Sequence, residues 1–420
     1  MAKTLKAKVE FSFEDLNKEL AKTSSLGSVM EISEFSEIDK YVHSGNNHLN
    51  ACLTGSLRKG YPSNRSIALA GPSGTGKTYL ILNTVKHHIA DDYYVIYFDS
   101  ENAVDKEQMV KFGIDTSKVR YEPIGTVEEF RTIVTQTCQT LIDAKRGGYE
   151  IPRILFVLDS AGNLASKKEV DDAISGSDKA DMSRSKKMKS IFRIIMNKMA
   201  EIKATFLFSN HVYMTQDFYP ETKAGGGTGP EYSASIILFL SKSKLREEKK
   251  VDGKKIKEQT GIIVTARPNK NRFAKPNTVK FHIDFNKGMN AFVGMENYIS
   301  WDVCGIDRGY LYSEKEYSKL KDKEKEGLQK FEYVDTETGE MATKYFEYSG
   351  TSNKIIVKHL GRATDNREFF TDAVFTEDVL KAIDAHIKPI FNYGIDETSV
   401  DDFDLEEDAF TTTEDDSDDI

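Results

Sequence analysis

The sequence predicts an α/β fold with a mostly parallel, doubly wound sheet, on two observations. Apolar strands alternate with amphipathic helices from about residue 45 to residue 288, which is the order that produces a parallel sheet covered by helices. A glycine-rich segment, 71–78, lies between one of these strands and the helix that follows it. Ligands of such sheets bind at the carboxyl ends of the strands, so this segment marks the expected ligand edge.

The expected strands are short and nearly continuously apolar, as in YVIYFD and ILFVLD. This composition suits strands that are covered on both faces of a sheet. Strands are predicted over 67–70, 94–99, 154–159, 205–210, 236–240, 262–266 and 279–284. Helices are predicted from residue 79, over 127–144 and over 183–202, where apolar side chains recur at helical spacing.

Four regions are expected along the chain. Residues 1–43 are an N-terminal segment whose amphipathic helix, 13–22, is too short to form a core and packs on its own chain or on a neighbouring subunit. Residues 44–290 are the α/β core, from which 242–258 leaves as a charged hairpin around Asp252-Gly253. Residues 291–395 are a small α+β domain with a late helix at 376–387, and residues 396–420 are a disordered acidic tail.

The composition is ordinary for a globular protein of 420 residues, with 39% hydrophobic and 30% charged side chains. No apolar run approaches the roughly 18–20 residues that span a bilayer, so no membrane association is expected. The N-terminal sequence lacks the apolar segment of a signal peptide. Cys52, Cys138 and Cys304 are widely spaced, so we expect reduced thiols in a cytoplasm rather than disulfides or a metal cluster.

The net charge is unevenly distributed. It is −9 for the whole chain, but 13 acidic side chains and no Lys or Arg fall within 389–420, so the remaining residues sum to +4. A mildly basic body with an acidic tail is a marked charge asymmetry. We expect the tail to compete electrostatically with anionic groups for the basic segments of the body, to an extent that depends on salt.

The segment 71–78 matches the P-loop pattern for phosphate binding. Its glycines let backbone N–H groups surround phosphates, its lysine can reach the β- and γ-phosphates, and its threonine hydroxyl can hold Mg²⁺. The alternative, a glycine-rich turn with a solvent-exposed lysine, does not explain the flanking strand and helix. The residues expected to bind the nucleotide are Gly71, Pro72, Ser73, Gly74, Thr75, Gly76, Lys77 and Thr78.

Three further strand ends carry polar side chains that an NTPase needs. Asp159 ends ILFVLD and is expected to act at Mg²⁺ together with Thr78, although an Asp in a strand-to-loop turn is common. Glu101 follows YFDS and is a candidate general base, or a glutamate at a helix start. Asn210 and His211 end TFLFSNH and could contact a γ-phosphate, or His211 could be a buried structural histidine.

Two segments that follow these strands favour contact with nucleic acid. The glycine-rich and aromatic segment after His211 suits single-stranded nucleic acid, and the segment after Asp159 is rich in basic residues, although these could also belong to a solvated helix face. The DNA-binding candidates are Tyr213, Phe218, Tyr219, Lys223, Gly225, Gly226 and Gly227 in the first segment, and Lys167, Lys168, Arg184 and Lys186 in the second.

In this order, these features resemble the RecA family of DNA strand-exchange recombinases, and within it the UvsX recombinases of large tailed phages. The resemblance covers 25–290 well and the remainder loosely. It is carried by SLGSVMEI (25–32), GPSGTGKT (71–78), YFDSEN (97–102), LDSAGNLASKKE (158–169), DMSRSKKMKSIFRII (181–195), SNHVY (209–213), GGGTGPEYSA (225–234) and TETGEM (336–341).

The resemblance implies a RecA-like core and roles for individual residues. Glu101 falls at the catalytic glutamate and Asp159 at the Walker B aspartate of the family, and His211 takes the place where many relatives have glutamine. Residues 163–182 and 213–229 fall at the two DNA-binding loops. Lys270 and Arg272 fall where two basic residues reach the nucleotide of the adjacent subunit. Asp105 falls near adenine, but Gln108 lies near the position of the tyrosine that often stacks on the base.

The implied function is that of an ATP-dependent recombinase acting in recombination, repair and recombination-dependent replication. ATP and Mg²⁺ would bind, the chain would hydrolyse ATP in a DNA-dependent way, and a filament on single-stranded DNA would pair with a homologous duplex. Its N-terminal segment would dock on the next subunit, and single-strand-binding and mediator proteins are expected partners. A ring helicase with the same core and a non-catalytic ATP-binding regulator are the alternatives; the long segment after His211 favours the filament, and Glu101 argues against the regulator.

Overall fold

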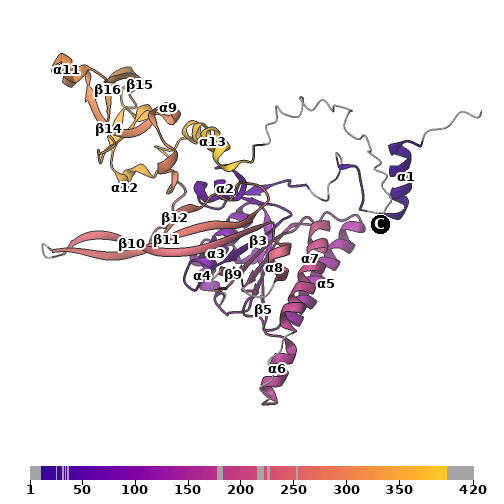
Figure 1. Cartoon of the computed structure of the whole chain (residues 1–420). Helices are drawn as coiled ribbons and strands as arrows, with labels where there is room; N and C mark the ends of the chain where they lie inside the picture. The colour runs from indigo at the N-terminus through magenta and orange to yellow at the C-terminus, as the bar shows by residue number, and fades with distance from the viewer. Residues whose placement is uncertain are drawn as a thin grey trace, which may run out of the picture.

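The computed structural model describes residues 11–394, apart from positions 25, 31–32, 34, 36, 177–182, 215–221, 225–227 and 252–253. Its centre is a nine-stranded sheet in the order β13-β12-β11-β10-β3-β7-β6-β4-β5 (Figure 1). The strands from β10 to β5 are parallel throughout. β11, β12 and β13 (Gly288–Met289) extend the other edge in antiparallel fashion. The predicted α/β class with a mostly parallel sheet is confirmed.

The central strands lie where the apolar runs predict them. They are β3 (Ser66–Ala70), β7 (Thr205–Asn210), β6 (Arg153–Asp159), β4 (Tyr93–Asp99) and β12 (Val279–Asp284). Every residue of β3 and β7 is buried. The edge strand β5 (Val119–Pro123) was not predicted, because its sequence VRYEP is polar and none of its residues is buried.

Helices cover both faces of this sheet. α3 (Lys77–Ala90) lies on one face, and α5 (Val127–Arg146) and α7 (Arg184–Glu201) lie side by side on the other (Figure 1). Ile67 of β3 packs in one hydrophobic cluster with Leu80 of α3, whereas the next residue, Ala68, packs in a second cluster with Phe130 of α5. This alternation of neighbouring side chains between two cores is what a doubly covered sheet requires.

A long hairpin extends from the core. β10 (Ile236–Val251) and β11 (Lys254–Asn271) pair from Ile236↔Asn271 to Val251↔Lys254, and their distal half leaves the body of the molecule (Figure 1). The predicted charged hairpin is confirmed, but it continues without interruption from the core strands predicted at 236–240 and 262–266. Its turn, Asp252-Gly253, lies outside the described residues.

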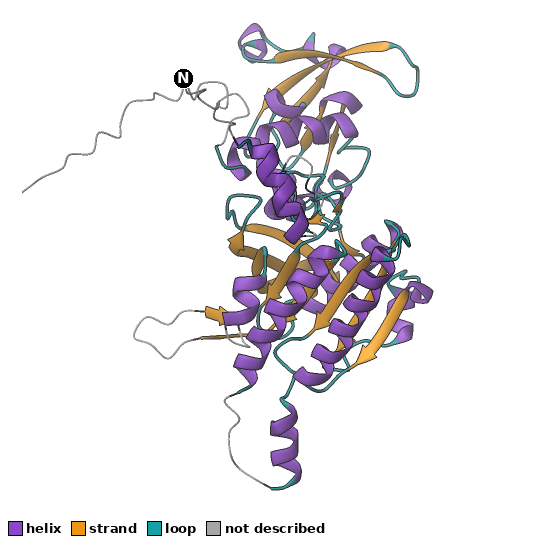
Figure 2. Cartoon of the chain, turned by 90° about the vertical axis from the view of Figure 1, so that its right-hand side faces the viewer, coloured by secondary structure: helices purple, strands orange, loops and turns teal. Residues whose placement is uncertain are grey.

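The two segments expected to be loops contain regular structure. The segment 163–182 contains α6 (Lys167–Ile174), the isolated helix at the foot of Figure 2. It begins with a capping box between Ser166 and Glu169, a signal that the sequence SKKE carries. The segment 213–229 contains the short hairpin of β8 (Val212–Met214) and β9 (Thr222–Ala224) and the start of α8 (Thr228–Ser233). Residues 177–182, 215–221 and 225–227 lie outside the described residues.

The N-terminal helix forms as predicted. α1 (Phe13–Thr23) is capped by reciprocal hydrogen bonds between Ser12 and Asp15, and none of its residues is buried. Between it and the core, β1 (Tyr41–Val42) pairs with β2 (Tyr61–Pro62), and α2 (Asn47–Thr54) is almost wholly buried. α4 (Lys106–Lys111) follows β4.

The C-terminal region is a second α+β unit, at the top of Figure 2. Its antiparallel sheet has the order β15-β16-β14-β17-β18, formed by Gln329–Val334, Met341–Tyr348, Ile306–Ser313, Ile355–Val357 and Arg362–Thr364. Short helices flank or connect these strands: α9 (Trp301–Cys304), α10 (Glu314–Tyr317), α11 (Asp322–Lys325) and α12 (Asn366–Phe369).

The last helix, α13 (Glu377–Phe391), returns to the core. The carboxylate of Asp384 accepts a hydrogen bond from Ser56 Oγ at 3.1 Å, and Ile383, Ile387 and Phe391 belong to the same hydrophobic cluster as α3. The predicted domain boundaries stay predictions, because this cluster runs through both units. The acidic tail, 396–420, lies outside the described residues. Among the described helices, none combines the length and apolarity that a membrane crossing needs.

Candidate active site

The P-loop lies at the carboxyl edge of the sheet, where β3 ends. The N–H of Gly71 donates to the carbonyl of Asn210 at 3.2 Å, which joins the loop to the end of β7. Two positions require glycine. A Cβ on Gly71 would lie 2.7 Å from the carbonyl oxygen of Leu240, and Gly76 has a φ of +90° with a Cβ position 3.0 Å from Ile283 Cδ1. The loop therefore keeps its shape only without side chains at these positions.

Lys77 points back into this loop. Its Nζ donates to the carbonyls of Gly71 at 2.8 Å and Pro72 at 3.0 Å. Burial is the main cause of a lowered pKa for the Lys77 ammonium; the carboxylates of Glu101 and Asp159 oppose this effect and Lys242 adds to it. A buried cation beside the backbone groups of the loop is well suited to bind a phosphate oxygen.

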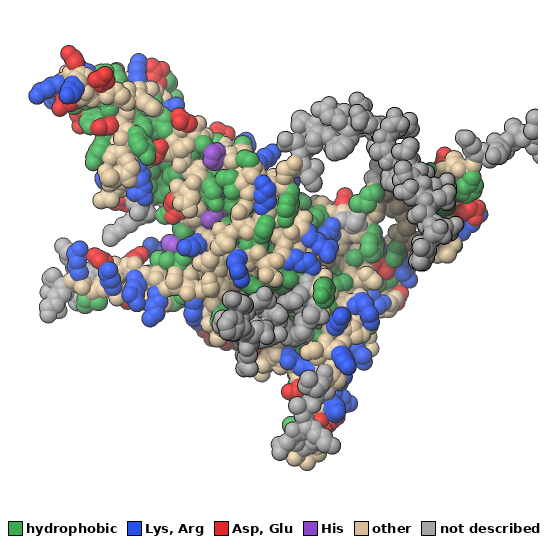
Figure 3. All heavy atoms as spheres, in the orientation of Figure 1, with side chains coloured by type: hydrophobic (Ala, Val, Ile, Leu, Met, Phe, Trp, Pro, Cys, Tyr) green, Lys and Arg blue, Asp and Glu red, His purple; other side chains and the backbone are tan. Residues whose placement is uncertain are grey.

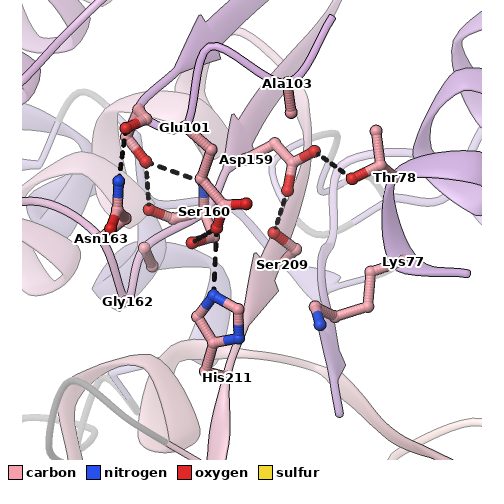
Figure 4. Close-up of polar contacts among 12 residues, drawn as sticks. Lys77, Thr78, Glu101, Ala103, Asp159, Ser160, Gly162, Asn163, Ser209 and His211 are labelled. Atoms are coloured by element: carbon pink, nitrogen blue, oxygen red, sulfur yellow. Dashed lines mark hydrogen bonds and ion pairs between the residues drawn. The ribbon is translucent and has the colours of Figure 1, made fainter. Parts of the chain in front are cut away.

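Thr78 and Asp159 meet beside the lysine (Figure 4). The Thr78 hydroxyl donates to Asp159 Oδ2 at 2.9 Å, the Tyr97 hydroxyl donates to the same oxygen at 3.2 Å, and Ser209 donates to Oδ1. Burial raises the pKa of the Asp159 carboxyl, and these hydroxyl donors oppose the shift.

The oxygen atoms of Thr78 and Asp159 fit a magnesium ion. Mg²⁺ usually takes one or two carboxylates, keeps several waters and completes its shell with substrate phosphates. In the described ranges no group of three or more His, Cys, Asp or Glu side chains could form a metal site made of protein alone. One carboxylate and one hydroxyl beside a phosphate loop match the first arrangement.

Glu101 follows β4 and is held by two side chains from other strand ends. Ser160 Oγ donates to Glu101 Oε1 at 2.5 Å, and His211 Nε2 lies 3.1 Å from the same oxygen (Figure 4). The Glu101 N–H donates to Asp99 Oδ1 at 2.9 Å. The structure thus brings Lys77, Thr78, Glu101, Asp159 and His211 together at one edge of the sheet.

Lys270 and Arg272 are not part of this group. Lys270 pairs with Ile237 of β10, which pairs with Ala68, the middle residue of β3. β11 runs away from the P-loop edge, so Arg272, just beyond the end of β11, lies toward the opposite edge. Lys270 Nζ donates to the carbonyl of Tyr232 at 3.1 Å. Neither basic residue therefore joins the group of side chains at the P-loop edge of its own chain.

Asp105 lies at the start of α4. Its side chain caps that helix by accepting from the N–H of Gln108 at 2.8 Å. Asp105 also lines a cavity of about 540 Å³ together with Met109 and Tyr121. The expected contact of Asp105 with adenine stays a prediction.

Among the described basic candidates for DNA contact, some side chains are exposed and one is bound to the backbone of its own chain. Lys167 and Lys168 are exposed on α6, and Lys186 is exposed on α7. Arg184 instead donates from Nε to the carbonyl of Leu164 at 2.5 Å and from its guanidinium to Gly162, so it holds the turn after β6. The backbones of Tyr213 and Lys223 pair in the β8–β9 ladder. Phe218, Tyr219 and Gly225–Gly227 lie outside the described residues.

Sequence reasoning did not select the basic face of α7 as a unit. Lys186, Lys189 and Arg193 are all exposed and recur at i, i+3 and i+7, which places them on one side of the helix. The exposed ring of Tyr232 on α8 lies beside them, with Lys189 Nζ 5.8 Å from its centroid. The helical spacing was the available signal. Figure 3 shows Lys and Arg side chains gathered over the α6–α7 corner of the molecule.

The fold and the site define a class of protein. A parallel sheet whose first core strand leads through a P-loop into a helix, with a Thr–Asp pair and a glutamate at the neighbouring strand ends, is that of a P-loop NTPase.

Comparison with known proteins identifies the family. The RecA N-terminal domain model matches residues 8–290. The recombination and repair protein of Enterobacteria phage T4 is 30% identical over 325 residues, covering 76% of this chain and 75% of that protein. A plasmid RecA protein of Lactococcus lactis is 27% identical over 199 residues, covering 47% and 54%, and RecA of Prochlorococcus marinus strain MIT 9515 is 25% identical over 293 residues, covering 68% and 72%. The chain belongs to the RecA family, as the sequence motifs predict, and membership implies a nucleotide-binding ATPase.

Proposed function

We propose that this chain is an ATP-dependent recombinase that assembles on single-stranded DNA and pairs it with a homologous duplex, in recombination, repair and recombination-dependent replication. One observation carries the proposal most directly. Ser160 and His211 are the two side chains that contact Glu101. Ser160 precedes the segment that contains α6, and His211 precedes the β8–β9 hairpin. The candidate catalytic group and the candidate DNA-binding segments are therefore joined by two hydrogen bonds.

The residues at the P-loop edge of the sheet have distinct roles in ATP hydrolysis. Lys77 and the P-loop N–H groups bind the phosphates of the substrate, and Thr78 and Asp159 would hold Mg²⁺. The ion, when bound, neutralises charge on the phosphate oxygens. Glu101 orients the attacking water and accepts its proton. Because Glu101 Oε1 already receives the Ser160 and His211 contacts, its second oxygen is the one available to water.

The link to DNA runs through the segments after β6 and β7. A change in the position of Glu101 would act on Ser160, which leads toward α6, and on His211, which leads into β8. We assign the backbone of single-stranded DNA to the basic face of α7, flanked by α6 and the β8–β9 hairpin. Exposed cations at helical spacing beside an exposed tyrosine suit a strand that is held by its phosphates and by stacking.

Assembly would complete the ATP site. β11 runs away from the P-loop edge and carries Lys270 and Arg272 with it, which favours a role at the nucleotide of an adjacent subunit. α1 offers a route to that contact, because Phe13, Leu16 and Leu20 expose 69, 40 and 54% of their surface on one stripe of the helix. An unpartnered apolar stripe favours docking on a neighbour.

A strand-exchange assay tests the proposal. The protein is mixed with ATP, Mg²⁺, single-stranded DNA and a homologous duplex, and joint molecules are followed on gels while phosphate release is measured. Joint molecules that require homology, and hydrolysis that rises with single-stranded DNA, are expected. Lys77→Ala is expected to abolish both. Unwinding of a forked duplex without joint molecules would contradict the recombinase proposal and favour a helicase.

A further inference from the structure

A second lysine, Lys242 on β10, contacts the P-loop. Lys242 Nζ donates to the carbonyl of Ser73 at 3.3 Å, while Lys77 Nζ donates to the carbonyls of Gly71 and Pro72. Three consecutive carbonyls of the loop therefore hold two ammonium groups. We propose that Lys242 is a second lysine, from the same chain, for the terminal phosphate of the bound nucleotide. This assignment rests on the nucleotide binding proposed above.

The sheet delivers Lys242 to this place. β10 runs parallel to β3, with Phe239 opposite Ala70, the last residue of β3. β10 continues beyond this edge of the central sheet, and Lys242 lies three residues past Phe239. On the hairpin, Lys242 pairs with Val264, and directly paired residues share a face. Val264 Cγ2 lies 3.9 Å from the Cβ position of Gly76. Lys242 is thus on the face of the hairpin from which α3 begins.

The loop leaves room for this ammonium. A Cβ on Gly74, at the apex of the loop, would lie 2.4 Å from Lys242 Nζ, and Gly74 has a φ of +71°. Glycine therefore provides both the backbone conformation and the space beside the lysine. The apex of a P-loop lies close to the outermost phosphates, so the terminal phosphate is the group that Lys242 would meet.

The charges also favour a phosphate over the carbonyl. A 3.3 Å contact to a neutral oxygen is weak, and among the described residues Lys242 has no ion pair. Lys255 and Lys257, farther along the hairpin, differ because both lie within 4 Å of Glu248, at 3.3 and 3.7 Å. Two ammonium groups at one loop repel each other, and an anion bound between them converts this repulsion into shared attraction.

Nucleotide titrations separate this role from general support of the loop. Fluorescent ADP and the slowly hydrolysed ATPγS are titrated, each with Mg²⁺, into the wild type, Lys242→Ala, Lys242→Arg and Lys244→Ala. We expect Lys242→Ala to weaken ATPγS binding by about tenfold and ADP binding by less than about twofold, on the scale of one charge-assisted hydrogen bond. Lys242→Arg keeps most of the affinity. Lys244, two residues along the same exposed face, is the matched control and is expected to change neither affinity.

Every outcome decides the assignment. Equal losses of affinity for ADP and ATPγS, or no loss of affinity for either, would overturn the assignment of Lys242 to the terminal phosphate. The variant Lys242→Met and a thermal melt of each variant verify that a loss of affinity is not caused by unfolding. The result is independent of strand exchange. A wild type that binds both nucleotides but forms no joint molecules would refute the recombinase proposal and leave the lysine assignment to be decided by the titrations.

Discussion

Thr78 and Asp159, separated by 81 positions in the sequence, are joined by a 2.9 Å hydrogen bond from the threonine hydroxyl to the carboxylate. The bond fixes the first turn of α3 to the end of β6. It also places one hydroxyl and one carboxylate oxygen side by side next to Lys77, at the position where Mg²⁺ is expected.

Replacing Thr78 by valine tests this pair. The change keeps the shape of the side chain and removes the hydroxyl, so we expect the Mg²⁺-dependent gain in ADP affinity to fall by about tenfold and stability to fall by about 1 kcal/mol. Calorimetric titration of ADP with and without Mg²⁺, together with urea unfolding, measures both. Thr84→Val is the control, because the Thr84 hydroxyl lies away from Asp159 and donates to the carbonyl of Leu80 at 2.7 Å. An unchanged Mg²⁺-dependent gain in the Thr78 variant would exclude the hydroxyl as a ligand.

Ser160 is expected to act as a positioning residue for Glu101. Ser160 is fully buried, and its hydroxyl holds Glu101 Oε1 at 2.5 Å. We expect Ser160→Ala to lower kcat for ATP hydrolysis by about tenfold with little change in KM, whereas Glu101→Gln loses at least about a hundredfold while still binding ATP. Steady-state kinetics and nucleotide titration measure these effects. Parallel changes in kcat and KM for Ser160→Ala would indicate general damage to the site, and normal turnover in Glu101→Gln would remove that residue from its role.

The basic face of α7 predicts a specific salt dependence. Replacing Lys186, Lys189 and Arg193 by alanine removes three cations that can each neutralise a phosphate. The slope of log affinity for single-stranded DNA against log salt is expected to fall by about 0.7 for each phosphate that is no longer neutralised. Fluorescence anisotropy over a range of salt concentrations measures the slope. Lys111→Ala, on α4 and paired with Glu107 at 2.7 Å, serves as control, and a triple variant with the wild-type slope would place the DNA elsewhere.

The exposed stripe of α1 predicts a loss of self-association on mutation. We expect Leu16→Ser with Leu20→Ser to reduce the mean mass of assemblies several-fold in light scattering, because these changes remove apolar area that a neighbour would cover. Lys18→Ser changes the polar side of the same helix, where Lys18 pairs with Glu14 at 2.9 Å, and is expected to leave the mass unchanged. Equal masses for both variants and the wild type would show that α1 does not join subunits.

Stability is expected to fall in mild acid because His88 is buried. Burial lowers the pKa of His88 from 6.5 to about 4, and a hydrogen bond with the Thr84 carbonyl only partly opposes this. Between these two pKa values, His88 is protonated in the unfolded chain and neutral in the folded chain. The stability present above pH 6.5 is lost as pH falls toward 4, by about 2 kcal/mol between pH 7 and pH 5 for this group.

Urea unfolding at pH 7 and pH 5 measures that loss. His88→Phe, which keeps the packing against Tyr93 at a ring separation of 4.9 Å, is expected to remove this part of the pH dependence. His386→Gln changes an exposed histidine of α13 and is expected to keep it. A His88→Phe variant with the full wild-type loss would show that other groups cause it.

Most of the central sheet could be predicted, because strands that are buried on both faces consist of consecutive apolar residues. β5 could not, since VRYEP lies at the edge and has no buried residue. The extension of β10 from Ser241 to Val251 was equally hidden as a continuation of a core strand, because outside the body its side chains are charged. α6 was missed although Ser166 and Glu169 form a recognisable capping box.

The site divides along similar lines. Lys77, Thr78, Asp159 and Glu101 end strands or begin a helix in recognisable motifs, and the parallel sheet then places them at one edge. Tertiary contacts decided the others. Arg184 belongs to a basic stretch, but only the fold shows that it binds the carbonyls of the turn after β6. Lys242 lies in a charged hairpin, and only the pairing of β10 with β3 brings it to Ser73.

The placement of Lys270 and Arg272 away from their own P-loop has a further consequence. If they serve the next subunit, each chain carries two unlike half-sites, and a row of subunits has a direction. A row of n chains then contains n − 1 complete sites, with a bare P-loop at one end and an unused basic pair at the other. A single chain would have almost no ATPase activity, and the activity per chain would rise with the number of chains in the row. A factor that recognises one end could cap that end while the opposite end continues to grow.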